Sequence, residues 1–180
     1  RQETVIACFG AAHAGGLFVP INPILRAEQV GHILNDCAVT VLVTSATRLD
    51  SLEATLANCP TLRHIVLTDD VSTHAAHPAW SALMAEAYGT VSPAPTFRAA
   101  QTPPGTNAVA IFYTSGSTGK PKGVVISHRN FLIGAQSVAH YLENRPDDRL
   151  LAALPLSFDA GFSQLTTAFH AGACVVLHNY

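Results

Sequence analysis

The spacing of apolar residues predicts an alternation of helices and strands in the first half of the chain. Over residues 26–37, apolar side chains recur with the i, i+3, i+4, i+7 spacing of an amphipathic helix. Apolar runs at residues 40–44 and 65–68 have the length and composition of buried strands, and a second helical pattern over residues 48–57 separates them. Strand, helix and strand in this order predict a parallel βαβ unit. A shorter helix is expected over residues 80–87.

The composition changes over residues 89–107, where proline and glycine lie among Ser, Thr and Ala. Such a composition is typical of a linker. We therefore expect a first, partial α/β subdomain over residues 1–88 and a second over residues 108–180. In the second, the pattern predicts strands at 108–112 and 124–126, a helix from a Ser127 cap to about Asn144, a strand at 150–154, a helix at 158–170 and a strand at 174–177.

The segment between the first two strands of the second subdomain is the richest in chemically active groups. It reads Tyr113-Thr114-Ser115-Gly116-Ser117-Thr118-Gly119-Lys120-Pro121-Lys122-Gly123. Glycines allow tight turns and bring backbone N–H groups close to an anion, while hydroxyls add donors and lysines add positive charge. These properties predict a polyphosphate-binding loop, with charge-assisted hydrogen bonds that contribute about 1.5–3 kcal/mol each. An ordinary surface turn is the alternative, and the agreement of strand, loop and lysine positions argues against it.

The loop differs from a Walker A motif, which needs a glycine, four residues and Gly-Lys-Ser/Thr at the start of a helix. Thr114 stands where the first glycine would be, and Lys120 precedes Pro121. Because proline disfavours helical backbone in the residue before it, no helix is expected to start at Lys120. A phosphate loop between two strands argues against a P-loop NTPase. No G-x-G-x-x-G follows either strand of the first subdomain, so a Rossmann site is not predicted.

From Ile111 to Gly123 the sequence resembles the signature of the AMP-forming adenylate-forming superfamily: acyl-CoA synthetases, adenylation domains of nonribosomal peptide synthetases, and luciferases. That signature is an apolar strand, small hydroxylic residues, Gly, Ser/Thr, Thr, Gly, any residue, Pro, Lys and Gly. Every position is satisfied, with Lys122 as the fixed lysine. The resemblance implies an α/β fold made of parallel βαβ layers of the large N-terminal domain of such an enzyme. The nucleotide-binding residues that it implies are Thr114, Ser115, Gly116, Ser117, Thr118, Gly119 and Lys122.

Two further blocks resemble the same superfamily. Residues 11–23 follow the order of small residues, Gly-Gly, aromatic, Val-Pro and Asn-Pro. Residues 154–161, followed by Ala171-Gly172-Ala173, resemble the block that lines the carboxylate-substrate pocket. The resemblance therefore implies that Phe158, Asp159 and Gly161 bind the substrate.

The chemistry implied by the resemblance is carboxylate activation. A carboxylic acid reacts with ATP, in the presence of Mg²⁺, to give an acyl-adenylate and pyrophosphate, and a thiol of CoA or of a carrier protein then takes the acyl group. The chain starts within a helical pattern at residues 3–12, ends on a strand, and lacks the adenine, ribose, hinge and catalytic-lysine motifs. We therefore expect a fragment whose catalytic lysine lies downstream, and which alone does not complete turnover.

Asp159 bears on the substrate class. In amino-acid-activating members an aspartate after phenylalanine pairs with the substrate ammonium, and Phe158-Asp159 matches that pair. Gly161, Gln164 and Leu165 depart from the amino-acid pattern, whereas Phe-Asp-x-Gly followed by Gln-Leu also occurs in acyl-CoA ligases. We therefore expect an acyl-CoA ligase, with an amino-acid adenylation domain as the alternative. Two further alternatives stay open. Asp159 could only cap the helix that follows, or the whole chain could be an inactive phosphate-binding fragment.

Charge and composition exclude several other classes. The net charge is −2, so no nucleic-acid surface is expected. No apolar run approaches the roughly 20 residues of a transmembrane helix, and no signal sequence is visible, so we expect a cytoplasmic protein. The four cysteines, at positions 8, 37, 59 and 174, are far apart and are expected to be buried free thiols. His74 and His77 lack a third ligand, so no metal site is predicted.

Overall fold

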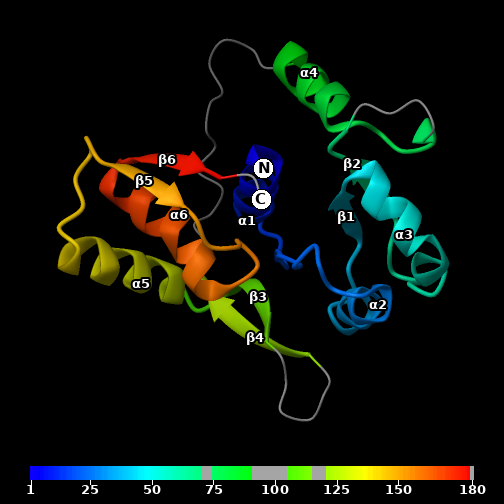
Figure 1. Ribbon diagram of the computed structural model, residues 1–180, viewed down its shortest axis with the longest axis horizontal. Coiled ribbons are helices and arrows are strands. Elements are labelled where there is room, and N and C mark those ends of the chain that lie inside the picture. The colour runs from blue at the N-terminus through cyan, green and yellow to red at the C-terminus, as the bar shows by residue number, and fades with distance from the viewer. Residues whose placement is uncertain (70–73, 91–104, 115–120, 179–180) are drawn as a thin grey trace. The chain divides into compact units, whose positions relative to one another are not determined.

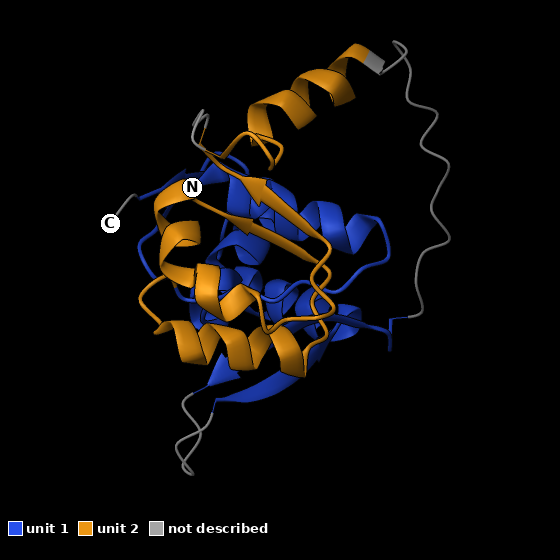
Figure 2. Ribbon diagram, turned by 90° about the vertical axis from the view of Figure 1, so that its right-hand side faces the viewer, with its two compact units in different colours: residues 1–22, 99–180 blue, residues 23–98 orange. Residues whose placement is uncertain are grey.

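A computed structural model of the chain describes residues 1–69, 74–90, 105–114 and 121–178. The chain divides into two compact units, one formed by Arg1–Asn22 together with Ala99–Tyr180 and the other by Pro23–Arg98 (Figure 2). These units differ from the predicted subdomains in one respect, because the first 22 residues group with the second half of the chain. Most of the predicted linker, residues 91–104, lies outside the described residues, so the boundaries at residues 88 and 108 stay a prediction.

The unit of residues 23–98 contains the predicted βαβ motif. Its elements are α2 (Ala27–Asp36), β1 (Val41–Thr44), α3 (Ala46–Leu56), β2 (His64–Leu67) and α4 (Trp80–Thr90). Strands β1 and β2 are parallel, with a register that runs from Val41 opposite His64 to Thr44 opposite Leu67. On the predicted apolar faces of α2 and α3, Val30, Ile33, Leu34, Leu49 and Leu52 are buried, whereas Cys37 and Leu56 are half-buried. The helical and strand periodicities are therefore confirmed in this unit.

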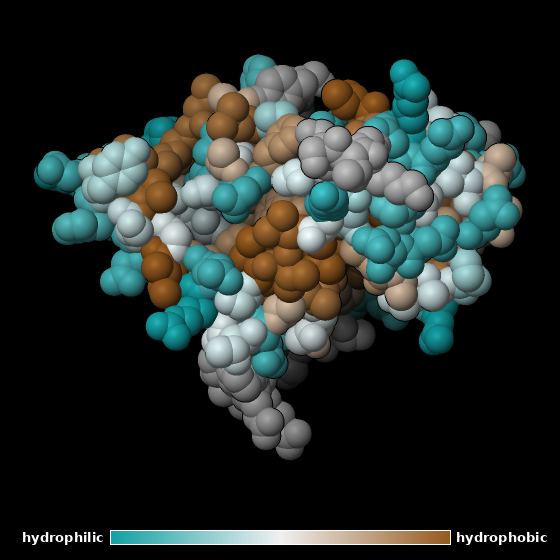
Figure 3. All heavy atoms as spheres, turned by 90° about the horizontal axis from the view of Figure 1, so that it is seen from below, coloured by the Kyte–Doolittle hydropathy of each residue, from teal (hydrophilic) through white to brown (hydrophobic). Residues whose placement is uncertain are grey.

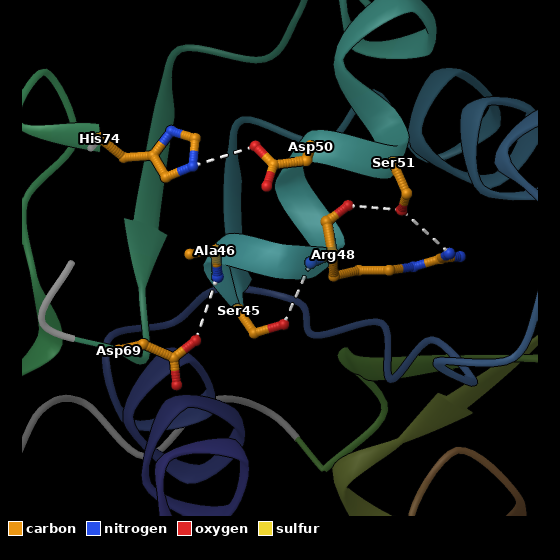
Figure 4. A network of polar contacts seen from close by, with 7 residues as sticks. All are labelled: Ser45, Ala46, Arg48, Asp50, Ser51, Asp69 and His74. Atoms are coloured by element: carbon orange, nitrogen blue, oxygen red, sulfur yellow. Dashed lines mark hydrogen bonds and ion pairs between the residues drawn. The ribbon is translucent and has the colours of Figure 1, made fainter. Parts of the chain in front are cut away.

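Two side chains bind the N-terminal amides of α3. The Oγ of Ser45 accepts a hydrogen bond from the backbone N–H of Arg48 at 3.3 Å, and the Oδ2 of Asp69 accepts one from the N–H of Ala46 at 3.1 Å (Figure 4). The first N–H groups of a helix have no partner within it, and a negative charge near them is favourable. Because Asp69 follows β2, this contact ties the start of the crossover helix to the end of the second strand.

The other unit contains the two strands that flank the predicted phosphate loop and also residues 154–161, which are called the substrate block below. Its elements are α1 (Gln2–His13), β3 (Ala108–Thr114), β4 (Lys122–Ser127), α5 (His128–Tyr141), β5 (Arg149–Ala152), α6 (Asp159–Ala171) and β6 (Cys174–Leu177) (Figure 1). Strands β5 and β6 are parallel and α6 connects them, whereas β3 and β4 form an antiparallel pair. The α/β fold class is thus confirmed, and the chain contains an antiparallel hairpin in addition to the parallel pairs.

Ser127 starts α5 as predicted. Its Oγ accepts from the N–H of Asn130 at 3.2 Å, and the Oδ1 of Asn130 accepts from the N–H of Ser127 at 3.0 Å. This reciprocal pair is a variant of the capping box, which satisfies two backbone donors at once. The helix ends at Tyr141, three residues earlier than predicted. Ala135 and Ala139 are its buried residues, whereas Leu142, directly after its end, is exposed.

The segment around Phe18 explains why the first 22 residues belong to this unit. The backbone N–H of Phe18 donates to the carbonyl of Val109 at 3.0 Å, and the N–H of Ile111 donates to the carbonyl of Phe18 at 3.0 Å. These bonds place the segment parallel to β3, in a single-residue bridge between Phe18 and Ala110. The block at residues 11–23 is therefore bound directly to the strand that enters the phosphate loop.

Apolar side chains also reach the surface (Figure 3). The large exposed ones include Val124 and Val125 on β4 and Leu132 and Ile133 on α5. β4 is therefore the outer strand of the hairpin, while β3 is mostly buried. None of the described helices combines the length and apolar character needed to cross a bilayer.

Candidate functional site

The predicted phosphate-binding loop connects β3 to β4. The last pair of the register joins Thr114, at the end of β3, to Lys122, at the start of β4. Both residues are exposed, so a hydroxyl and a cation stand on the two sides of the loop entrance. No helix follows Lys120, as predicted: the chain returns as a strand, and α5 begins only at His128. Residues 115–119, the other predicted phosphate ligands, lie outside the described residues.

Gly123 lies against the neighbouring strand. A Cβ built on it would come within 2.8 Å of the Cγ2 of Ile111 and 3.2 Å of the Cζ of Tyr113. The absence of a side chain therefore lets Ile111 and Tyr113 of β3 pack directly over the β4 backbone, beside Lys122. This is a local reason for the glycine at the end of the signature.

The substrate block forms the connection between β5 and the first turn of α6. Phe158 occupies the N-cap position of α6 and is 48% exposed, and the exposed Asp159 is the first helical residue. The alternative of Asp159 as the N-cap residue is therefore wrong, although its carboxylate is favourable in the first turn. Ser157 is buried, and its Oγ has no hydrogen-bond partner among the described residues.

Gly161 permits a very close approach inside the same block. A Cβ built there would lie 1.9 Å from the carbonyl oxygen and 2.6 Å from the carbonyl carbon of Pro155. These atoms belong to the backbone, so they cannot move aside as a flexible side chain could. The glycine that the resemblance singled out thus has a structural role, which is to let the connection fold back onto α6.

A cluster of phenylalanine rings joins the three sequence blocks. Phe162 of α6 is completely buried, and its ring centroid lies 5.1 Å from that of Phe18, 5.7 Å from that of Phe112 and 5.4 Å from that of Phe131. Phe18 comes from the first block, Phe112 from the strand before the phosphate loop, and Phe162 directly follows Gly161. No local sequence pattern predicts this cluster, because its members are far apart along the chain.

The cysteines are free but not uniformly buried. Burial raises the pKa of the Cys8 thiol to about 12, so this residue stays protonated in the core at neutral pH. Burial also raises the pKa of Cys59, which a hydrogen bond with Asn35 partly offsets. The expectation of burial was wrong for Cys174, which is exposed on β6, and Cys37 is half-buried.

His74 is bound to a carboxylate within the unit of residues 23–98. Its Nε2 lies 3.0 Å from the Oδ1 of Asp50 on α3 (Figure 4). Within the part of the chain that the structure describes, no three His, Cys, Asp or Glu side chains are placed to hold a metal ion.

Comparison with known proteins identifies the family. Residues 1–179 match the family described as AMP-binding enzyme, so the chain belongs to this family, and the resemblance noted in the sequence is confirmed. The chain is 30% identical to the phosphinothricin tripeptide synthetase PhsC of Streptomyces viridochromogenes, over 97% of its own length and 14% of that protein. It is 32% identical to the PKS-NRPS hybrid synthetase acdB of Aspergillus candidus, over 97% of its length and 6% of that protein.

A solved structure supports the same assignment. The fold matches the anthranilate CoA ligase AuaEII, crystallised in complex with anthranoyl-AMP, with a TM-score of 0.87 and 27% sequence identity. The match covers 100% of this chain and 34% of that chain. The predicted fold of an adenylate-forming enzyme is therefore confirmed, while the chain spans only a small part of the curated relatives described above.

Proposed function

We propose that this chain forms the phosphate-binding and acid-binding part of an adenylate-forming ligase. In the first half-reaction a carboxylate oxygen of the substrate attacks the α-phosphorus of ATP, and the bond to the bridging oxygen of the β-phosphate breaks, which releases pyrophosphate. In the second, the sulfur of CoA attacks the acyl carbonyl and AMP leaves. The observation that carries this proposal is the strand–loop–strand arrangement, with Thr114 and Lys122 paired at its entrance, in a member of the AMP-binding enzyme family.

The nucleophile in the first step is already an anion, so the protein contributes mainly position and charge neutralisation. We assign the β- and γ-phosphates to the loop from Thr114 to Lys122, with Ser115, Gly116, Ser117, Thr118 and Gly119 as further donors. Mg²⁺ belongs to the same proposal and would arrive with the nucleotide, because a divalent ion bound to ATP phosphates needs few protein ligands. ATP–pyrophosphate exchange that depends on a carboxylic acid is the direct test.

Replacing Lys122 with alanine is expected to lower acid-dependent ATP–pyrophosphate exchange at least tenfold, which corresponds to about 1.4 kcal/mol. The reason is the loss of a charge-assisted hydrogen bond to a phosphate. The same effect is expected for Thr118→Ala. The matched control is Arg129→Ala, which removes one exposed positive charge from the first turn of α5. Exchange that falls equally in Lys122→Ala and Arg129→Ala would contradict a specific phosphate contact.

For the acid, we propose an acyl substrate and CoA as the acceptor, with Phe158, Asp159 and Gly161 in the acid-binding site. The structural likeness to a CoA ligase and the sequence Phe-Asp-x-Gly support this assignment. The alternative is an amino acid transferred to a carrier-protein thiol. Its support is the set of peptide synthetases among the relatives, together with the Phe158-Asp159 pair.

The change Asp159→Asn is expected to separate these alternatives. With an acyl acid no substrate cation needs a counter-ion, so the variant loses only the interaction of its charge with the helix terminus, about 0.3–1 kcal/mol. With an amino acid as substrate, the substitution removes the carboxylate that pairs with the substrate ammonium. The desolvated ammonium then has no counter-ion, which costs roughly 3–5 kcal/mol and most of the activity.

The measurement compares wild type and Asp159→Asn in the protein as it occurs naturally, with fatty acids and amino acids as substrates. A preference for an amino acid that disappears in the variant would reject the acyl-acid proposal in favour of the alternative. Equal activity of both proteins with a fatty acid supports it.

A further inference from the structure

The side-chain amide of Gln164 binds two places in the β5–α6 connection. Its Oε1 accepts hydrogen bonds from the backbone N–H groups of Ala153 at 3.0 Å and Leu154 at 3.4 Å. Its Nε2 donates to the carbonyl of Gly161 at 2.9 Å and to that of Leu154 at 3.5 Å. The side chain therefore reaches from α6 back to the end of β5 and spans the substrate block.

The partners of Gln164 match the bonding capacity of a primary amide. Such an amide offers one oxygen with two lone pairs and one nitrogen with two donors, and both sides are used here. A carboxylate of the same length would keep the two accepted bonds but would face the carbonyls of Leu154 and Gly161 without a donor. An apolar side chain would lose every one of these bonds.

Two other contacts in the connection depend on the same geometry. Gly161, which receives a bond from Gln164 through its carbonyl, packs directly on the backbone of Pro155. The N–H of Phe158 donates to the carbonyl of Pro155 at 3.2 Å. The amide of Gln164 thus fixes the two ends of a short segment, and Phe158 and Asp159 lie at the point where that segment enters α6.

We propose that Gln164 is a positioning residue of the acid-binding site. It holds residues 153–158 against α6 and thereby sets the position of Phe158 and Asp159 relative to the bound acid. The inference rests on the proposed function, because it assigns the segment to acid binding, and it adds a residue that does not itself contact the substrate. A precise geometry of the acid matters because misplacement of a reacting group lowers the rate strongly.

The test uses Gln164→Leu and Gln164→Glu in the protein as it occurs naturally. For each we measure the KM for the acid and the KM for ATP by ATP–pyrophosphate exchange, and the hydrogen exchange of the Ala153 and Leu154 amides. Loss of these hydrogen bonds is expected to raise the KM for the acid at least about tenfold in Gln164→Leu, with the KM for ATP changed less than about twofold. Gln164→Glu keeps the accepted bonds and is expected to show a smaller increase, which isolates the donated bonds.

The matched control is Gln136→Leu, the same substitution at an exposed position of α5 in the same unit, for which both KM values are expected to stay unchanged. Faster amide exchange at Ala153 and Leu154 together with a selective rise in the KM for the acid supports the proposal. A loss that affects acid and ATP equally would assign Gln164 to general stability and overturn it. If the wild type is active and both Gln164 variants have the same KM for the acid as the wild type, the positioning role alone is overturned. If the wild type catalyses no ATP–pyrophosphate exchange with any acid, the proposed function itself is refuted.

Discussion

Replacing Phe162 with alanine is expected to lower the free energy of unfolding by about 3–5 kcal/mol. Phe162 is fully buried, and its ring contacts those of Phe9, Phe18, Phe112 and Phe131, with centroid distances from 5.1 to 5.8 Å. Truncation removes buried apolar surface and leaves a cavity, because the surrounding rings come from different segments of the chain and cannot all close in. Urea unfolding followed by circular dichroism measures the change.

Phe169→Ala provides the control for this prediction. Phe169 lies on the same helix and has a ring contact with Phe9 at 5.4 Å, but it is 47% exposed. Its truncation is expected to cost less than half as much as that of Phe162, since much of the lost surface is already in water. Similar losses in the two variants would show that the cluster around Phe162 does not hold this unit together.

Gly161→Ala is expected to destabilise the protein by about 1–3 kcal/mol and to weaken binding of the acid substrate. Helix propensity alone predicts the opposite sign, because alanine in a helix is more favourable than glycine by about 1 kcal/mol. The contact decides against propensity, since the new Cβ would lie 1.9 Å from the carbonyl oxygen of Pro155. Relief of this overlap requires a shift of the connection that carries Phe158 and Asp159.

Gly134→Ala separates the two effects. Gly134 lies within α5, and a Cβ built on it meets nothing within 4 Å. Propensity then acts alone, and the variant is expected to be more stable by about 0.5–1 kcal/mol. Thermal unfolding of both variants checks that Gly161→Ala lowers the stability and that Gly134→Ala raises it. Stabilisation by both substitutions would mean that the connection yields easily and that Gly161 is dispensable for its shape.

The sequence alone predicted the type and order of the helices and strands, and it predicted the family. Local periodicity identified α2, α3 and the parallel β1–β2 pair, because the pattern of apolar residues reflects which face of an element is buried. Ser127 was recognised as a helix start since capping depends on neighbouring residues only. The absence of a helix directly after Lys120 was also predicted correctly, because Pro121 disfavours helical backbone in the residue before it.

The tertiary structure decided which distant residues act together. The pairing of Phe18 with β3, the ring cluster around Phe162, and the bonds of Gln164 to Ala153 and Leu154 join positions that no local pattern relates. In the sequence, Gln164 is only one position of the pattern that bears on the substrate class. Its hydrogen bonds to Ala153 and Leu154 form because α6 packs back against the end of β5. Such contacts depend on the path of the chain between the two contacting residues. That path is set by the packing of the whole unit, so no short stretch of sequence predicts it.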